Sequence, residues 1–462
     1  MEIEKLIKQP ESKVLEFKSD LSSLDPILKT IVAFANTAGG TLLIGISPQS
    51  ELLGVENIFK AEEKLANTIA DNIHPSMLPE IEISTLNNKN ILIVKVAYWK
   101  GPFYLKKLGM PNGVYIRLGS TSRPAGPELL AEMQRTILQP SFDEQPLLDL
   151  SLDSLEFKKA QDVFQQAGKN LNEQKLRSLG VLVQSANKLV PSIGGLILFG
   201  KQEIRQRFLP DARVSCARFR GNDKTEIIDR YEVEGTILDA VSAVPKFILR
   251  NTRLSAKIQG IRRENIPEYS LTAIREVLIN ALAHCDYSIT GSRIQIAIFN
   301  DRLEIQNPGM LPFGFTLEDL KDGVSRVRNR VIARVFNELD LMEEWGSGYK
   351  RIIEACVAGG YPEAIWQELG TSFRVIFYPH AATSLEPNSS KPTHLIKDLP
   401  PKQTAILNIF AVDEDLSFRQ IMERLPFNIP ERSLRHDLAK LRSLGFLTSK
   451  TQGKIIFWHK EH

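Results

Sequence analysis

The sequence predicts a multi-domain α+β protein, and three observations support this fold class. The 462 residues are about three times the length of an average domain of roughly 150 residues. Short strand patterns alternate with helical patterns along the chain up to about residue 380. A stretch rich in Pro, Ser and Thr at 381–398 has no periodicity, so it is predicted to be a linker before a compact block at 399–462.

Composition indicates an ordinary globular protein, which we expect to be cytoplasmic. Hydrophobic residues make up 43% of the chain and charged residues 24%. The charged start lacks the apolar core of a secretory signal, and no apolar run approaches the ~18 residues of a spanning helix, so no membrane is expected. Three cysteines without CxxC spacing predict reduced thiols and argue against a thiolate metal site.

Residues 1–140 form the first predicted domain. Strands are expected over KVLEFK, GGTLLIGIS and NILIVKVAYW, with a helix over LDPILKTIVAFANTA. Glu16 and Lys18 share one face of the first strand, and Glu11 lies five residues upstream. Such residues either hold a divalent metal, with the lysine steadying a water, or form a surface ion pair. The segment SPQSELLG offers only one acid, Glu51, as a third carboxylate ligand.

A basic stretch between Lys100 and Arg123 contains no acidic residue. Its cations include Lys106, Lys107, Arg117 and Arg123, and tyrosines lie among them. Basic side chains neutralise phosphates and aromatic rings stack on bases, so the stretch predicts nucleic-acid contact. The alternative is a strand edge protected by charge. A hairpin with an Asn-Gly turn, MPNGVYIR, is expected to present part of this stretch.

An intermediate α/β region is predicted over 150–265, where PSIGGLILFG and ARVSCARF have the character of buried strands. A further domain is predicted over 266–380. It begins with the helix REVLINALAHCDY at 275–287. At ~100° per residue, a buried stripe forms on one side of this helix, with Glu276 and Asn280 nearly opposite. The helix alone would favour a solvated polar face.

Two features downstream change that interpretation. Asn307 and Gly309 end a strand in LEIQNPG, and Gly346-Ser347-Gly348 opens directly into a predicted helix. Backbone N–H groups and the dipole at a helix start suit phosphate. The ordered set, ExxxN on a helix, a polar residue with Gly at a strand end, then GxG within about 70 residues, predicts a nucleotide site.

The block 399–462 is predicted to fold as three helices followed by two strands, the order of a winged helix-turn-helix. Leu434, Leu438 and Leu441 of the third helix are spaced to pack inward. From Arg419 to Lys460 there are nine Lys or Arg and three acids. The cations of the third helix are expected to contact double-stranded DNA, unless the block is a protein-interaction module; they are Arg432, Arg435, Lys440 and Arg442.

Together these segments resemble the GHKL ATPases and, more closely, bacterial transcriptional regulators. Those regulators carry a Schlafen-type AlbA-like α/β domain and a GHKL-like ATPase domain (the Bergerat α/β sandwich). In this chain a C-terminal winged helix is expected to follow. The resemblance rests on REVLINALAHCDY, DRLEIQNPG, RVRNRVIARVF, EEWGSGYKRI, the N-terminal ESKVLEFK and AFANTAGG, and the middle block around PSIGGLILFGK.

The resemblance implies ATP and Mg²⁺ as cofactors. Asn280 would coordinate the metal, and Glu276 would be the general base that makes the domain an ATPase. Asn307 would stand where many relatives have an Asp that accepts the adenine amino group, and Gly309 would leave room for the base. The remaining candidate ATP-binding residues are His284, Asp286, Gly346, Ser347 and Gly348.

Two residues depart from the family pattern. Asn307 lacks the charge of Asp, and Cys285 stands where relatives usually have an arginine. Cys285 falls in the buried stripe, so it is predicted to be a packing residue.

The sequence therefore predicts an ATP-binding, DNA-binding transcriptional regulator, in which ATP·Mg closes the loop between Asn307 and Gly346. One alternative is a metal-dependent nuclease acting through Glu11, Glu16 and Lys18. Another is a non-catalytic adaptor. A homo-oligomer is expected, with a dimer favoured, because GHKL domains and winged helices both commonly dimerise.

Overall fold

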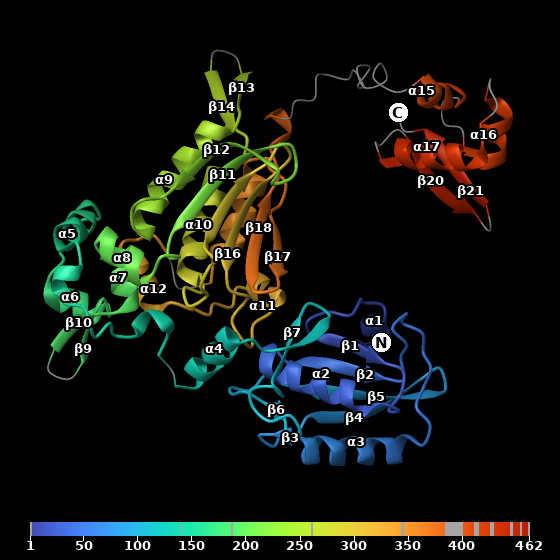
Figure 1. Cartoon of the computed structure of the whole chain (residues 1–462), viewed down its shortest axis with the longest axis horizontal. Coiled ribbons are helices and arrows are strands. Elements are labelled where there is room, and N and C mark those ends of the chain that lie inside the picture. Colours follow the sequence, from blue (N-terminus) through green and yellow to red (C-terminus); the bar gives the residue numbers. More distant parts are fainter. Residues whose placement is uncertain are drawn as a thin grey trace. The chain divides into compact units, whose positions relative to one another are not determined.

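The chain forms two compact units, Met1–Ser384 and Leu385–His462. The computed structural model describes residues 2–138, 140–185, 188–259, 262–342, 346–383, 401–410, 415–425, 429–443, 447–452 and 455–460 (Figure 1). Over that part of the chain, no helix has both the length and the apolar character that a bilayer crossing requires.

A four-stranded sheet forms the centre of the N-terminal domain, in the order β1-β2-β5-β4. Its strands are β1 (Leu15–Lys18), β2 (Gly40–Ile44), β4 (Glu80–Leu86) and β5 (Lys89–Val96). Because side chains alternate along a strand, Leu42 and Ile44 pack with α2 (Leu24–Thr37) and α3 (Ile58–Asn72). Leu43 faces the other side, where α1 (Glu2–Ile7) packs. The three predicted strands and the predicted helix are confirmed.

Two short antiparallel pairs and a helix complete this domain. They are β3 (Ile73–His74) with β6 (Tyr104–Leu105), β7 (Tyr115–Leu118) with β8 (Thr121–Pro124), and α4 (Pro127–Leu138). The predicted Asn-Gly turn is present, because the Val114 N–H donates to the Pro111 carbonyl at 3.1 Å and Val114 forms an isolated antiparallel bridge with Tyr104. The predicted hairpin goes no further, because β7 pairs with the strand after it. The chain reverses at Gly119, whose φ of +58° suits glycine.

A mainly helical region connects the two domains of the first unit. Its elements are η1 (Phe142–Glu144), η2 (Leu152–Ser154), α5 (Phe157–Gln166), α6 (Glu173–Ser178), β9 (Leu182–Ser185), β10 (Lys188–Pro191), α7 (Ile193–Phe199) and α8 (Gln202–Phe208). The strand predicted over PSIGGLILFG is wrong, since this segment forms α7. Ser192 caps the helix by accepting a hydrogen bond from the Gly195 N–H at 3.0 Å. All seven residues of α7 are buried, so no polar face revealed its helical period.

A six-stranded sheet, in the order β12-β11-β15-β16-β18-β17, forms the centre of the second domain. Its strands are β11 (Val214–Arg220), β12 (Glu226–Glu232), β15 (Ile294–Ile298), β16 (Leu303–Pro308), β17 (Ile365–Leu369) and β18 (Ser372–Phe377). β11 and β15 run parallel, whereas all other neighbours are antiparallel. The sequence prediction missed β12 and β17.

Helices cover this sheet, with α10 lying along it (Figure 1). The helices are α9 (Ile237–Asn251), α10 (Leu271–His284), α11 (Leu317–Lys321), α12 (Arg330–Glu338) and α13 (Gly348–Ala358); the hairpin of β13 (Leu254–Gln259) and β14 (Arg262–Pro267) precedes α10. The stripe predicted along α10 is confirmed, because all of its members are buried: Ile274, Val277, Leu278, Ala281, Leu282 and Cys285.

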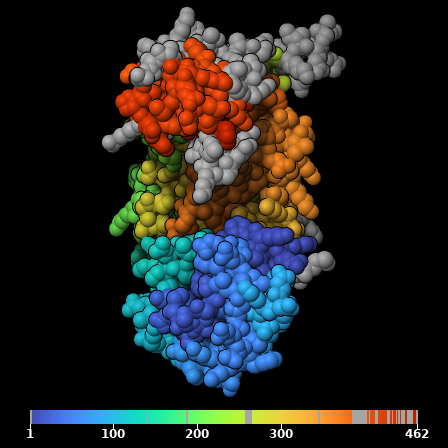
Figure 2. All heavy atoms as spheres, turned by 90° about the vertical axis from the view of Figure 1, so that its right-hand side faces the viewer, coloured from blue at the N-terminus to red at the C-terminus, as the bar shows by residue number. Residues whose placement is uncertain are grey.

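The two domains of the first unit are in direct contact. Figure 2 shows the first residues of the chain (dark blue) against the orange segment of the central domain. There the Lys13 ammonium pairs with the Glu368 carboxylate at 2.9 Å.

The described residues of the second unit form three helices and a three-stranded sheet in the order β19-β21-β20. Its elements are α15 (Pro401–Asn408), β19 (Asp415–Ser417), α16 (Phe418–Arg424), α17 (Glu431–Ser443), β20 (Leu447–Gln452) and β21 (Ile455–Lys460). Leu434, Leu438 and Leu441 are fully buried, as their spacing predicts. Of the predicted linker, 381–383 form a 3₁₀ turn, and the rest lies outside the described residues.

Candidate functional site

The polar side chains of α10 meet the glycine turn that opens α13. A Cβ atom added to Gly348 would lie 3.0 Å from Asn280 Nδ2 and 3.0 Å from Glu276 Oε1. Asn280 and Glu276 are themselves 3.4 Å apart, with the amide donating to the carboxylate. The predicted ExxxN and GxG motifs therefore face each other, and only a glycine leaves this space open.

These residues line a cavity of about 130 Å³ between α10, β16 and α13. Seven residues predicted from the sequence to bind nucleotide are in its wall: Glu276, Asn280, His284, Asn307, Gly309, Gly346 and Gly348. Two predicted residues are not. Asp286 lies outside the wall, and Ser347 precedes α13 without lining the cavity.

The end of β16 provides one side of the cavity. Asn307 is buried, and its Nδ2 donates to the Pro308 carbonyl at 3.2 Å. Oδ1 is therefore the atom of this amide that can accept a hydrogen bond from a ligand. Gly309 has a φ of +102°, and a Cβ there would lie 2.5 Å from Arg328 Nη1 and 2.9 Å from Asp286 Cβ. Both the conformation and the close packing require glycine.

Aromatic residues that the sequence prediction missed form an apolar side of the cavity. Tyr349 and Trp366 have ring centroids 4.7 Å apart, and Phe315 and Phe373 also contribute. Tyr349 follows the glycine turn directly, but Trp366 comes from a strand that was not predicted, so no sequence signal joined them. An apolar cavity with a few polar groups at one end is typical of small-molecule sites.

His284 is uncharged near neutral pH in this environment. Burial lowers its pKa to about 4, and the nearby positive charge of Arg328 acts in the same direction. His284 therefore lines the cavity as a neutral ring, which offers hydrogen bonds but no positive charge to a phosphate. Burial likewise raises the pKa of the Cys285 thiol, consistent with its predicted packing role.

A segment that we call the strap, residues 310–328, closes the cavity. Met310, Leu311, Leu320 and Val324 lie in the cavity wall. A Cβ on Gly346, whose φ is +67°, would overlap the carbonyl oxygen of Gly323 in the strap. The strap therefore rests directly on the glycine turn.

The strap is also attached to the N-terminal domain. Met310 and Phe313 are buried in a hydrophobic cluster with Ile116 and Met133 of that domain. The Gly314 N–H donates to the carbonyl of Thr37, the last residue of α2, at 2.5 Å. One segment thus packs against the cavity and against the N-terminal core.

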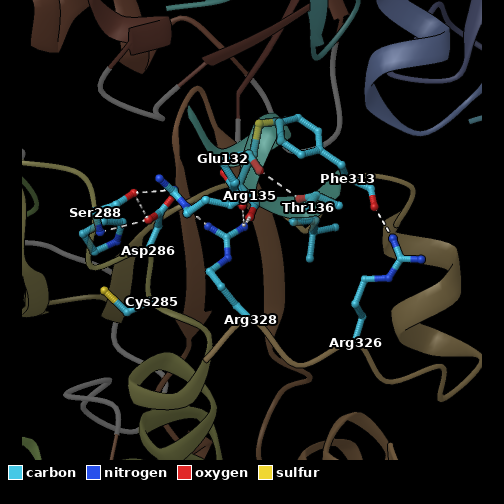
Figure 3. Close-up of polar contacts among 12 residues, drawn as sticks. Glu132, Arg135, Thr136, Cys285, Asp286, Ser288, Phe313, Arg326 and Arg328 are labelled. Atoms are coloured by element: carbon cyan, nitrogen blue, oxygen red, sulfur yellow. Dashed lines mark hydrogen bonds and ion pairs between the residues drawn. The ribbon is translucent and has the colours of Figure 1, made fainter. Parts of the chain in front are cut away.

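Arg328 holds the end of the strap in a buried cluster (Figure 3). Its guanidinium is 3.1 Å from Asp286 and 3.3 Å from Glu132 of α4, and it donates to the Met310 carbonyl at 2.7 Å. Burial by itself would raise the pKa of Asp286, but Arg328 and Ser288 outweigh it and lower that pKa. Asp286 therefore anchors the strap rather than lining the cavity between α10, β16 and α13.

The cavity contains oxygen donors of the kind that Mg²⁺ uses. Glu276 and Asn280 supply one carboxylate and one amide, and Mg²⁺ is commonly held by one or two protein oxygens together with substrate phosphates. The described residues contain no group of three or more His, Cys, Asp or Glu arranged to hold a metal without such help.

The candidate nuclease residues are engaged in the fold of the N-terminal domain. Glu16 is buried and pairs with Lys18 and, at 2.9 Å, with Arg117. Glu11 accepts a hydrogen bond from the Phe17 N–H at 2.9 Å. Arg117 is 1% exposed, so it belongs to this ion-pair cluster and not to a basic surface.

The other predicted nucleic-acid residues lie at the surface where their side chains are described. Lys106 donates to the Ala70 carbonyl, Lys107 pairs with Asp25, and Arg123 is exposed. On α17, the exposed Arg435 lies 3.8 Å from Glu431 and stacks on Phe418. The side chains of Arg432, Lys440 and Arg442 lie outside the described residues.

Comparison with known families matches two parts of the first unit. Residues 11–126 match the family described as Schlafen, AlbA_2. The chain contains a Schlafen AlbA_2 domain. Residues 291–377 match a family described as putative ATP-dependent DNA helicase recG C-terminal. This second match covers β15 through β18, the strap and the glycine turn, but it begins after α10.

Two solved structures are also similar to the chain. The DIP2311 protein from Corynebacterium diphtheriae is 18% identical over 99% of this chain and 96% of its own, with a TM-score of 0.44. The N-terminal domain of a putative ATP-dependent DNA helicase RecG-related protein from Nitrosomonas europaea is 27% identical over 27% of this chain and 90% of its own, with a TM-score of 0.22. No curated protein sequence matches the chain.

Proposed function

We propose that the chain is an ATP-binding, DNA-binding transcriptional regulator, in which ATP·Mg in the central domain controls nucleic-acid binding. The observation that carries the proposal is the approach of Gly348 to Glu276 and Asn280. Three separate sequence signals meet in one cavity, as the resemblance to GHKL ATPases implies. The description of the family matched at 291–377, which names ATP and DNA, supports both partners.

The side chains of the cavity have distinct roles in this proposal. Mg²⁺ would neutralise phosphate charge, with Asn280 as its protein ligand. Glu276 would orient the attacking water and accept its proton if ATP is hydrolysed. Backbone N–H groups of the Gly346–Gly348 turn would approach the phosphates. At the opposite end, Asn307 Oδ1 would accept a hydrogen bond from the adenine amino group.

The strap is the element that ATP would move. The cavity of about 130 Å³ lies below the roughly 300 Å³ at which ligand pockets typically begin. The strap also lies where phosphates would approach Gly346. ATP therefore displaces or reshapes the strap, which then closes over it, and the packing of Phe313 transmits this movement to the N-terminal domain.

The second unit would bind the DNA. Its three helices followed by the β20–β21 hairpin are in the order of a winged helix-turn-helix, and α17 exposes Arg435 as the predicted third helix should. Basic residues of the N-terminal domain, including Lys106 and Arg123, would add phosphate contacts.

Titration calorimetry of the full chain with ATP·Mg tests the central proposal. We expect binding by the parent and at least about tenfold weaker binding by Asn280→Ala, because the metal ligand is lost. Asn222→Ala, at an exposed asparagine outside the cavity, is the matched control. A parent chain that does not bind ATP·Mg contradicts the proposal.

A gel-shift assay with double-stranded DNA tests the coupling. We expect ATP·Mg to change the DNA affinity of the parent, and Phe313→Leu, which loosens the strap anchor, to reduce that change while preserving DNA binding without nucleotide. The matched substitution Phe59→Leu alters an exposed phenylalanine and should have no effect. Light scattering of the same samples tests the predicted dimer.

A further inference from the structure

A second cavity lies on the other side of the strap, between α4 and the central domain. Its volume is about 440 Å³, within the range typical of ligand pockets. It shares only Pro312 and Arg326 with the nucleotide cavity. The two cavities are therefore separate sites that adjoin the same segment.

Cationic side chains dominate the wall of this second cavity. Five of them line it: Lys100, Arg135, Arg326, Arg328 and Arg330. Only two carboxylates, Glu132 and Asp286, do so, and both pair with Arg328. The wall thus carries an excess of positive charge.

Three of these cations form no ion pair with a carboxylate of the described chain. Arg135 donates to Ser288 Oγ at 3.0 Å and lies 5.4 Å from the ring of Phe142. Arg326 donates to the Phe313 carbonyl, and Figure 3 shows its guanidinium directed away from Arg328. Lys100 is exposed at the mouth of the cavity. Arg135 and Arg326 thus donate to neutral partners. Glu132 and Asp286 lie near enough to Arg135 to attract it, but these two carboxylates face five cations, so the wall keeps positive charge for an anion.

We propose that this cavity binds a small phosphorylated molecule. Arginine presents several N–H donors in a planar fork that matches phosphate oxygens. Tyr98, Phe142 and Phe313 add aromatic surface to the wall, which suits a ring attached to the phosphate. The enclosed volume favours a small molecule over the continuous backbone of a nucleic acid. The proposal does not depend on ATP binding in the first cavity.

Titration calorimetry of the full chain with inorganic pyrophosphate, in buffer containing EDTA, tests this site. We expect the parent to bind and the double variant Lys100→Gln, Arg135→Gln to bind at least about tenfold more weakly, because both lost charges would contact phosphate. Neither residue lines the nucleotide cavity. Lys60→Gln removes an exposed cation of the same domain outside the cavity and should bind as the parent does.

Three outcomes would overturn the proposal. The first is no pyrophosphate binding by the parent. The second is loss of binding in Asn280→Ala but not in the double variant, which would assign the anion to the nucleotide cavity. The third is that a single-stranded oligonucleotide binds the parent but not the double variant, while pyrophosphate binds neither. The surface would then be a nucleic-acid contact. If the double variant fails to fold, the single variant Lys100→Gln, at an exposed position, repeats the test with an expected severalfold loss.

Discussion

Gly348→Ala should weaken the proposed ATP·Mg binding while leaving the stability of the fold nearly unchanged. No positive φ is required at Gly348, and alanine is the better helix former by up to about 1 kcal/mol, so the substitution should not destabilise α13 itself. The new Cβ would lie 3.0 Å from Asn280 Nδ2 and from Glu276 Oε1. Ordinary contacts begin near 3.4 Å, so each side chain must withdraw by a few tenths of an ångström.

That displacement is small for packing but large for metal ligation. Oxygen ligands of Mg²⁺ sit at about 2.0–2.1 Å in nearly ideal octahedral geometry, and a tolerance of about 0.2 Å is usual for metal sites. We therefore expect ATP·Mg affinity to fall roughly 10–100-fold, the usual effect of disturbing the surroundings of a metal ligand. The unfolding midpoint should change by no more than a few degrees, which corresponds to about 1 kcal/mol or less.

Calorimetric titration with ATP·Mg, and separately with ATP in EDTA, measures this effect. The loss should be greater with the metal present, since the displaced Asn280 is the protein ligand of the metal in the proposal. Gly126→Ala is the matched control, because its Cβ would meet only Glu128, at an ordinary 3.7 Å. If Gly348→Ala binds ATP·Mg as tightly as the parent, then Glu276 and Asn280 do not hold the phosphates or the metal.

Three further predictions concern stability, each measured as the free energy of unfolding of the first unit. Gly346→Ala should destabilise more than Gly291→Ala: both glycines have positive φ, which costs alanine about 1–2 kcal/mol, but only the first meets a backbone oxygen of the strap. Equal losses would show that the strap does not rest on the turn. His284→Gln should reduce the loss of unfolding free energy that the parent shows as the pH falls. The folded pKa of about 4 lies below the ordinary 6.5, so the parent loses up to about 3 kcal/mol as pH falls through this window. Asp143→Asn should act in the opposite sense. Burial raises the Asp143 pKa from 3.8 to about 6, so its contribution is present below pH 3.8 and is lost by pH 6. In Asp143→Asn, the free energy of unfolding should therefore rise more steeply between pH 4.5 and pH 7 than in the parent. An unchanged slope would mean that Asp143 does not titrate as expected.

Many residues that line the cavity between α10, β16 and α13 could be predicted to lie together because their positions follow from helical and strand periods. The 3.6-residue repeat places Glu276 and Asn280 together, and a glycine turn before a helix is visible in the sequence. Their approach to Gly348 depends on α10 and α13 packing side by side, which no local pattern determines. Tyr349 and Trp366 were missed for that reason, since their contact joins helix α13 to strand β17, which pairs with β18.

The failures have physical causes of the same kind. Helix α7 was predicted as a strand because a short, wholly buried run carries no polar face to reveal its period. Arg117 was predicted to lie on a basic surface because neighbouring residues in the sequence are basic. Its actual partner is Glu16, about 100 residues away, and a long-range ion pair leaves no local signal.

The strap explains how a small nucleotide could affect distant parts of the first unit. Displacing the strap requires exposing Met310 and Phe313, which are buried with the N-terminal domain. Each such side chain contributes roughly 1.5–3 kcal/mol, so complete release would cost about 3–6 kcal/mol. A ligand with an intrinsic dissociation constant of about 1 µM supplies about 8 kcal/mol, so complete release of the strap would leave about 2–5 kcal/mol, an observed dissociation constant of roughly 0.1–30 mM. The observed affinity is then weaker than the intrinsic one by the cost of release. For the same reason, loosening the anchor should strengthen ATP binding and weaken its effect on the N-terminal domain, a combination that damage to the cavity itself would not produce.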